Sequence, residues 1–136
     1  MAAADCIFCA IVAGELPAHL IAENDGAIAI ADIAPATRGH SLVIPRSHAA
    51  DIGDISAEEL TAAALLAQVI ARRARERLGA DGVNLLHSAG AAAWQTVFHF
   101  HLHVIPRYVG DPLRLPWAPS PGDPEAIAAA AAALRG

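Results

Sequence analysis

The segment FHFHLHVIPR, at residues 98–107, carries a histidine at every second position: His99, His101 and His103. In a β-strand, residues i, i+2 and i+4 lie on the same face. We therefore predict a strand over residues 96–105 with these imidazoles side by side on one face. The residues expected on the opposite face are apolar, namely Phe98, Phe100, Leu102 and Val104.

A row of imidazoles has three interpretations. Histidines two residues apart on a strand can chelate a catalytic metal. They can also form a phosphate-binding, nucleophilic site, because a neutral imidazole attacks phosphorus while its neighbours donate hydrogen bonds to the phosphate oxygens. The third interpretation is a polar strand face with no role in chemistry. The strict alternation, with a further histidine at His40 directly after Gly39, favours the two functional interpretations.

Cys6 and Cys9 form a C-x-x-C motif near the start of the sequence. This spacing alone fits a redox pair, two buried thiols or one half of a structural zinc site. A tetrahedral zinc site needs two more ligands, which must come from distant segments. His48 and one histidine of the triple are the candidates.

Periodicity and turn residues outline the elements that position these side chains. Ser56 and Glu59 form a capping box, and apolar residues at helical spacing predict a long helix that ends at Gly79. Shorter helices are predicted at residues 8–13 and after Asp123. Besides the histidine segment, strands are predicted at residues 19–23, 27–33, 40–45 and 83–87. The proline-rich residues 107–122 are expected to run over the surface.

These elements predict an α+β fold, an antiparallel sheet of about five strands with one long helix and short terminal helices. The length of 136 residues fits one domain. The chain has no lysine, which excludes Schiff-base and Walker-type lysine mechanisms. Its net charge of −5 and lack of a clustered basic face argue against a nucleic-acid partner. No apolar run reaches transmembrane length and residues 6–14 lack a basic leader, so we predict a cytoplasmic protein without a membrane partner.

Residues 95–105, QTVFHFHLHVI, resemble the signature of the histidine triad (HIT) family, in which a glutamine precedes histidines that alternate with hydrophobic residues. The blocks DIAP, at residues 32–35, and GHSLVIPRSH, at residues 39–48, resemble the other main motif of that family. The C-x-x-C motif is similar to that of its zinc-containing, Hint-like members. The resemblance covers most of residues 5–107 and implies a single HIT domain over residues 1–136, with a variable tail at residues 108–136.

The resemblance implies a homodimer that binds purine nucleotides and acts at the α-phosphate of nucleoside monophosphate derivatives, by hydrolysis or transfer. His101 would be the nucleophile and would form a nucleotidyl-histidine intermediate, which water then cleaves to release the monophosphate. His103 would hold an α-phosphate oxygen, and His40 would support the histidine cluster. No catalytic metal is expected.

The resemblance also implies contacts to the nucleotide and a structural zinc ion. Asp32 would bind the ribose hydroxyls, and the phosphate region would be contacted from Ser88, Gln95 and Thr96. The purine pocket would be lined by apolar residues: Ile7, Phe8, Ile11, Ile30 and Ile33. The zinc ligands would be Cys6, Cys9, His48 and His99.

Two positions depart from the family pattern. Ser88 stands where an asparagine is common, and it offers one hydroxyl instead of an amide. Trp94 stands where a glycine is common, directly before Gln95, and its ring is expected to border the phosphate site. Both differences are expected to affect which leaving group the site prefers. Purine nucleoside phosphoramidates and related adenylyl compounds are the expected substrates, and the alternatives are a dinucleoside polyphosphate hydrolase and a non-enzymatic nucleotide-binding or interaction protein.

Overall fold

The structure is a computed structural model, and it describes residues 3–136. Along the chain its elements are α1 (Ile7–Val12), β1 (Leu20–Glu23), β2 (Ala27–Ala31), β3 (Ser41–Pro45), α2 (Ala57–Leu78), β4 (Gly82–Leu86), the 3₁₀ turn η1 (Ala91–Ala93), β5 (Leu102–Arg107) and α3 (Pro124–Leu134). Within this part of the chain, no helix is long and apolar enough to cross a membrane.

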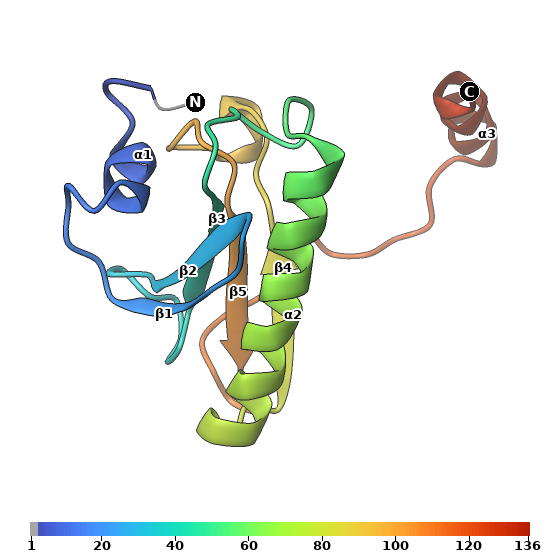
Figure 1. The fold of residues 1–136 in the computed structure, drawn as a ribbon. Coiled ribbons are helices and arrows are strands. Elements are labelled where there is room, and N and C mark those ends of the chain that lie inside the picture. The colour runs from blue at the N-terminus through green and yellow to red at the C-terminus, as the bar shows by residue number, and fades with distance from the viewer. Residues whose placement is uncertain (1–2) are drawn as a thin grey trace.

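The strands form one five-stranded sheet in the order β1-β2-β3-β5-β4, and every neighbouring pair is antiparallel. The long helix α2 lies across one face of the sheet, and the short helix α1 lies on the opposite side (Figure 1). The predicted α+β fold, with its antiparallel sheet and single long helix, is confirmed.

Helix α2 begins and ends where its capping residues predict. The Ser56 hydroxyl accepts a hydrogen bond from the Glu59 N–H at 3.2 Å, and Gly79 ends the helix with a left-handed φ of 68°. Small residues let the helix approach β2 closely. A Cβ atom added at Gly26 would lie 2.6 Å from the Cβ of Ala62, so a side chain there would push helix and strand apart.

Strand alternation divides the apolar side chains into two clusters. Phe100 and Val104 face α2, where they pack with Ala63, Ala67 and other buried residues. On the opposite face, the α1 residue Phe8 packs against a second group from β2 and β3: Ile28, Ile30, Leu42 and Ile44. The histidines that alternate with Phe100 and Val104 therefore face the side of the sheet that carries α1.

The strand predicted at residues 96–105 is wrong in its first half, because β5 begins only at Leu102. The ladder between β3 and β5 stops at the pair Val43 and Leu102. Two residues further along this register stands Pro45, which has no N–H to donate. The N–H of Phe100 instead donates to the carbonyl of Ala49 at 2.7 Å. His99 and His101 thus precede the strand, and the expected cover from Phe98 is absent, since this side chain is 50% exposed.

The tail, residues 108–136, stays close to the sheet only over its first few residues. The Arg107 guanidinium contacts the Asp111 carboxylate at 2.7 Å and ties residues 107–111 together. Beyond this pair the chain extends away to α3, which stands apart from the sheet (Figure 1) and buries none of its residues. The expectation that all of residues 107–122 run over the surface is therefore wrong for the second half of this segment.

Candidate functional site

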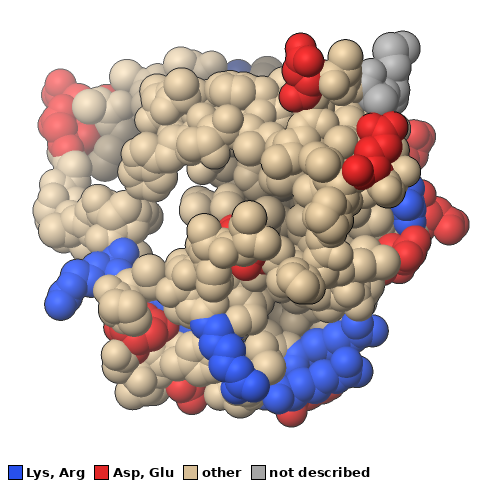
Figure 2. All heavy atoms as spheres, turned by 90° about the vertical axis from the view of Figure 1, so that its left-hand side faces the viewer, with Lys and Arg blue, Asp and Glu red and all other residues tan. Residues whose placement is uncertain are grey.

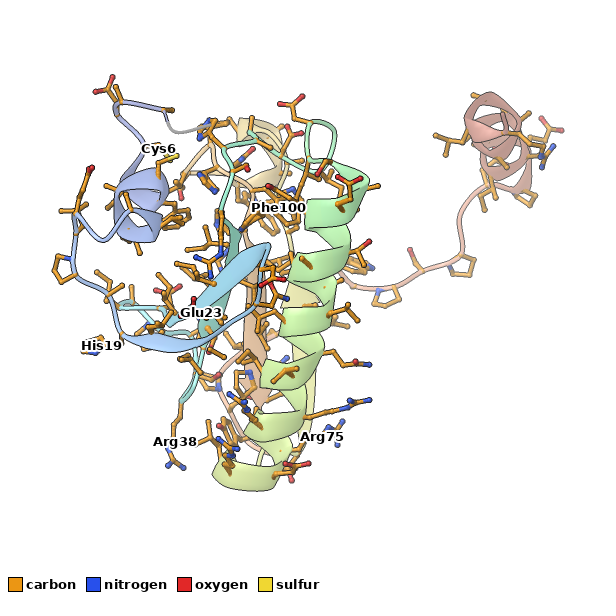
Figure 3. The ribbon with its side chains drawn as sticks, in the orientation of Figure 1. Cys6, His19, Glu23, Arg38, Arg75 and Phe100 are labelled. Atoms are coloured by element: carbon orange, nitrogen blue, oxygen red, sulfur yellow. The ribbon has the colours of Figure 1, made fainter. Side chains whose placement is uncertain are left out.

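Four metal-ligating side chains meet between α1 and the sheet: Cys6, Cys9, His48 and His99. Cys6 caps the N-terminus of α1 and Cys9 lies in its first turn. The Cys6 side chain lies on the side of the helix that faces the sheet (Figure 3). The Cys6 Sγ lies 3.3 Å from His99 Nδ1, and the Cys9 Sγ lies 3.4 Å from His48 Nδ1. All four ligand atoms lie within 4.8 Å of one another.

These distances fit a tetrahedral zinc ion. With Zn–S bonds of about 2.3 Å and Zn–N bonds of about 2.0 Å, adjacent sulfur and nitrogen ligands lie about 3.5 Å apart. The Nε2 of His99 lies 2.9 Å from the carbonyl of Pro45, which can only accept, so the proton is on Nε2 and the Nδ1 lone pair faces the sulfurs. Burial raises the pKa of the Cys6 thiol, so binding of a metal there would release a proton.

His101 is buried, and a backbone bond sets its tautomer. Its Nδ1 donates to the carbonyl of His99 at 2.8 Å, which leaves Nε2 as the unprotonated nitrogen of the neutral ring. The edge of Phe8 packs on this ring, with centroids 5.0 Å apart. Burial lowers the pKa of His101, and the bond to the His99 carbonyl offsets only part of this effect. At neutral pH the ring is therefore a neutral base with an available lone pair.

His40 and His103 form a hydrogen-bonded pair whose direction is set by the backbone of Ala36. The Ala36 N–H donates to His40 Nδ1 at 3.0 Å, so the neutral ring carries its proton on Nε2 and donates to His103 Nδ1 at 2.9 Å. His103 must then carry its own proton on Nε2. The ring centroids of His101 and His103 lie 5.0 Å apart, so a ring with an unshared lone pair and a ring with an N–H donor are neighbours.

Asp32 lies next to this pair, with its Oδ2 3.5 Å from His40 Nε2. Burial lowers the pKa of His40, and burial together with charges on His101 and His40 lowers the pKa of His103 to about 4. The ligand atoms of Asp32, His40 and His103 are close enough together for a cation. A metal bond to His40 Nε2 would, however, require loss of the Ala36 bond, because a neutral imidazole has only one lone pair to donate. The geometry therefore favours a hydrogen-bond relay over a second metal site.

An apolar pocket of about 280 Å³ opens beside the relay, between α1 and β2. Its lining includes five residues that were expected to contact the nucleotide: Ile7, Ile11, Ile30, Asp32 and Ile33. Phe8, expected in this lining, lies in the core behind it, against His101. The side of the molecule that carries α1 and β1 is largely uncharged, with most acidic and basic side chains near its margin (Figure 2). A flat, mostly apolar ring system suits such a pocket.

In the loop before the triad, the side chain of Gln95 is occupied by the backbone. Its Oε1 accepts from the Gly90 N–H at 2.7 Å, and its Nε2 donates to the carbonyls of Ala50 and Val97 at 2.7 and 3.1 Å. Gln95 therefore holds the loop together, and none of its donors points to the pocket. Ser88 is half-buried, while Thr96 is exposed beside Cys6 and His48.

Trp94 occupies a strained backbone conformation. Among residues 3–136 it is the only non-glycine residue with a positive φ, at 73°. A left-handed conformation costs a residue with a side chain about 1–2 kcal/mol, which explains why glycine suits this position. The indole is 67% exposed, so little burial offsets the strain.

One histidine at the site was missed in the sequence. His87 follows β4 directly, and its Nδ1 donates to the carbonyl of His101 at 3.1 Å. No motif singles it out. The only signal was a histidine at the end of the strand predicted at residues 83–87, in a chain where most of the other histidines cluster.

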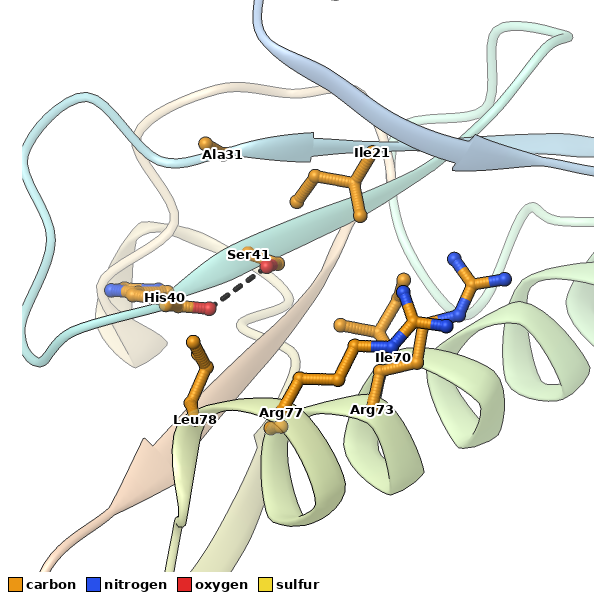
Figure 4. A pocket seen from close by; sticks show the side chains of 10 residues that line it. Ile21, Ala31, His40, Ser41, Ile70, Arg73, Arg77 and Leu78 are labelled. Atoms are coloured by element: carbon orange, nitrogen blue, oxygen red, sulfur yellow. Dashed lines mark hydrogen bonds between the residues drawn. The ribbon is translucent and has the colours of Figure 1, made fainter.

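A second cavity, of about 200 Å³, lies on the opposite face of the sheet, between α2 and β1 to β3 (Figure 4). Arg73 and Arg77, from successive turns of α2, stand beside one another at its rim. The Ser41 hydroxyl is already bonded to the Gly39 carbonyl at 2.9 Å, so the interior offers mainly apolar surface. Of the histidines and Asp32 at the site, only His40 also lines this cavity.

Residues 13–110 match the HIT domain, so the chain belongs to the histidine triad family, as its motifs predicted. A zinc-bound histidine triad family protein from Mycobacterium smegmatis is 50% identical, with a TM-score of 0.78 over 85% of this chain and 84% of that one. SMU.412c from Streptococcus mutans UA159 is 32% identical, with a TM-score of 0.91 over 98% of this chain and 85% of that one. Adenylylsulfatase HINT3 of Arabidopsis thaliana is 38% identical over 114 residues, which are 84% of this chain and 56% of that protein. The cysteine–histidine cluster fits the zinc-containing, Hint-like branch of the family.

Proposed function

We propose that this protein is a hydrolase or transferase that acts at the α-phosphate of purine nucleoside monophosphate derivatives, such as phosphoramidates and adenylyl compounds. The observation that carries the proposal is the complementary protonation of two adjacent rings. His101 presents an unprotonated Nε2, and His103 presents an N–H on the neighbouring ring. The Arabidopsis relative, an adenylylsulfatase by name, supports the same substrate class.

In the proposed reaction, the lone pair on His101 Nε2 attacks the α-phosphorus. A phosphorus–nitrogen bond forms and the bond from phosphorus to the leaving amine or oxygen breaks, with its electron pair going to the leaving group. A leaving amine takes up a proton from solvent, whereas sulfate leaves as the anion. The Nε2–H of His103 donates to a non-bridging phosphate oxygen as charge develops there. Water then attacks phosphorus, the bond to His101 breaks, and the monophosphate leaves with His101 neutral again. The bond from Ala36 keeps His40, and through it His103, in the donor tautomer during both steps.

The nucleotide is proposed to lie in the apolar pocket, with its purine against Ile7, Ile11, Ile30 and Ile33 and with Phe8 supporting the wall from behind. The Asp32 carboxylate, whose Oδ1 already accepts from Ala34 at 2.8 Å, is proposed to accept bonds from the ribose hydroxyls. Ser88, Gln95 and Thr96 belong to the loop proposed to border the phosphate. The bonds of Gln95 suggest that it shapes this loop.

We further propose that Cys6, Cys9, His48 and His99 hold a structural zinc ion. The donor set, the distances and the protonation of His99 all fit, and the Mycobacterium smegmatis relative is zinc-bound. Zinc would stabilise the packing of α1 against the sheet. The family assignment also supports a homodimer, a cytoplasmic location, and a division into a core of residues 5–107 and a variable tail.

The proposal is tested by turnover of a substrate panel and by trapping of the intermediate. The panel contains adenosine phosphoramidate, adenylyl sulfate and a dinucleoside polyphosphate. His101→Ala should reduce turnover by at least about 10³-fold, because covalent catalysis contributes several kcal/mol to lowering the barrier, while mononucleotide binding persists. His19→Ala, at an exposed histidine that belongs to neither the triad nor the cysteine–histidine cluster, is the matched control.

Mass spectrometry of acid-labile adducts should locate the nucleotidyl group on the peptide that contains His101. Turnover by His101→Ala within tenfold of wild type would overturn the assignment of the nucleophile. Tight mononucleotide binding without turnover of any panel member would favour the non-enzymatic nucleotide-binding alternative.

A further inference from the structure

His87 lies directly behind the nucleophile, and we propose that it is a positioning residue that holds the backbone of His101 for attack. The inference rests on the function proposed above. It concerns a side chain that lies outside the histidine triad motif and makes no contact with the nucleotide pocket.

The argument begins with the backbone bonds of the segment before β5. The Phe100 N–H points toward β3 and donates to the carbonyl of Ala49 at 2.7 Å. Successive residues of an extended chain direct their backbone groups to opposite sides, so the carbonyl of His101 points toward β4. Strand β4, however, ends at Leu86, which pairs with His103. The His101 carbonyl is therefore just beyond the last backbone partner on that side.

The imidazole of His87 supplies the missing donor. Its Nδ1 lies 3.1 Å from the His101 carbonyl, and because a carbonyl only accepts, the proton must be on Nδ1. The same tautomer is required at the other end of the ring, where Nε2 accepts from the Ile52 N–H at 3.1 Å. Two independent backbone groups thus define one neutral form of His87.

The ring is also fixed by packing. It lies on Phe100, with centroids 4.4 Å apart and planes inclined by 38°, and Phe100 is fully buried against α2. His87 therefore connects three parts of the molecule: the turn before α2 at Ile52, the core at Phe100, and the nucleophile. A side chain held from three sides is a firm support for the carbonyl that it binds.

This support matters because the orientation of the His101 ring depends on the backbone of the same segment. The ring is oriented by the bond from Nδ1 to the carbonyl of His99, so a shift of residues 99–101 moves the attacking Nε2. Reaction rates are sensitive to such displacements, since a change of about 1 Å can cost about 100-fold. The pocket is lined from α1, β2, β3 and the segments that follow α1 and β2, and no lining residue lies between residues 87 and 101. Nucleotide binding should therefore be affected much less.

The test compares two replacements of His87 in the zinc-loaded protein. His87→Asn keeps an N–H donor close to the position of Nδ1, whereas His87→Phe keeps a ring on Phe100 but removes both hydrogen bonds. We expect His87→Phe to lower the rate of His101 nucleotidylation, measured in single turnovers, by about 10- to 100-fold with KM within about threefold of wild type. His87→Asn should retain the rate within about fivefold, and His19→Asn is the matched control.

Two kinetic outcomes would overturn the positioning role: a His87→Phe rate within twofold of wild type, or equal losses in the Asn and Phe variants. A measurement on the wild type decides the matter even if neither variant folds. In long-range ¹H–¹⁵N spectra of histidine-labelled protein, His87 should be protonated on Nδ1, and a proton on Nε2 would refute the proposed bond. Absence of turnover in the wild type would instead refute the proposed function, and the catalytic meaning of His87 with it.

Discussion

Acidification should destabilise this protein through His103, whose pKa is lowered to about 4 by burial and by charges on His101 and His40. A histidine in the unfolded chain has a pKa of about 6.5. Above that pH the ring is neutral in both states, and the shift has no effect on stability. Below it, the unfolded chain binds a proton that the folded protein does not bind. The free energy of unfolding therefore falls with falling pH, until the folded protein is also protonated near pH 4.

The size of this effect follows from the two pKa values. A difference of about 2.5 pH units corresponds to a loss of at most about 3.4 kcal/mol. The ring of His103 is only partly buried, and screening by solvent reduces the loss, so we expect about 1–2 kcal/mol. Burial lowers the pKa of His40, His99 and His101 as well, so the whole protein should lose more stability than His103 alone explains.

Urea unfolding of wild type and His103→Gln at pH 7 and pH 4.5 measures how much of the acid-induced loss in free energy of unfolding is due to His103. The glutamine can still accept the bond from His40. Both proteins keep the cysteine–histidine cluster, so any loss of metal in acid is common to both. The variant should lose about 1–2 kcal/mol less stability than wild type on acidification, and His19→Gln should behave as wild type. Equal losses in wild type and His103→Gln would refute the reasoning, because the surroundings of His103 would then not disfavour its charged form.

Two further outcomes concern the zinc cluster and Trp94. Freshly purified protein should contain about one zinc ion per chain by elemental analysis, and Cys6→Ser with Cys9→Ser should abolish it and lower the melting temperature; metal-free wild type or an oxidised cysteine pair would contradict the zinc site. Trp94→Gly should stabilise the fold by about 1 kcal/mol in urea unfolding, since it relieves the left-handed strain at an exposed residue. It should also raise the specificity constant for dinucleoside polyphosphates relative to a phosphoramidate, and an unchanged ratio would show that the indole points away from the substrate.

The features that the sequence predicted correctly are those encoded locally. The caps at Ser56 and Gly79 determine where α2 begins and ends, and the alternation around Phe100 determines which side chains face α2. The prediction for the first half of the histidine strand was wrong, because the point where this strand begins depends on a residue of another strand. Pro45 on β3 has no N–H, so the ladder between β3 and β5 loses its next donor there. The exposed position of α3 also lay outside the reach of local patterns, since an alanine-rich helix has the same propensity whether or not anything packs against it.

The triad histidines show the same limit of prediction from local sequence at the scale of single atoms. His99, His101 and His103 are one residue type at one spacing, yet each presents a different group, because each ring meets a different backbone partner. The Pro45 carbonyl holds the His99 proton on Nε2 and turns Nδ1 to the cysteines, whereas the His99 carbonyl holds the His101 proton on Nδ1 and leaves Nε2 for attack. At His103 the backbone acts through a second ring, since the Ala36 N–H sets His40, which then sets its neighbour. The motif specifies which side chains meet, and the surrounding carbonyls and N–H groups determine which ring suits the proposed role of metal ligand, nucleophile or donor.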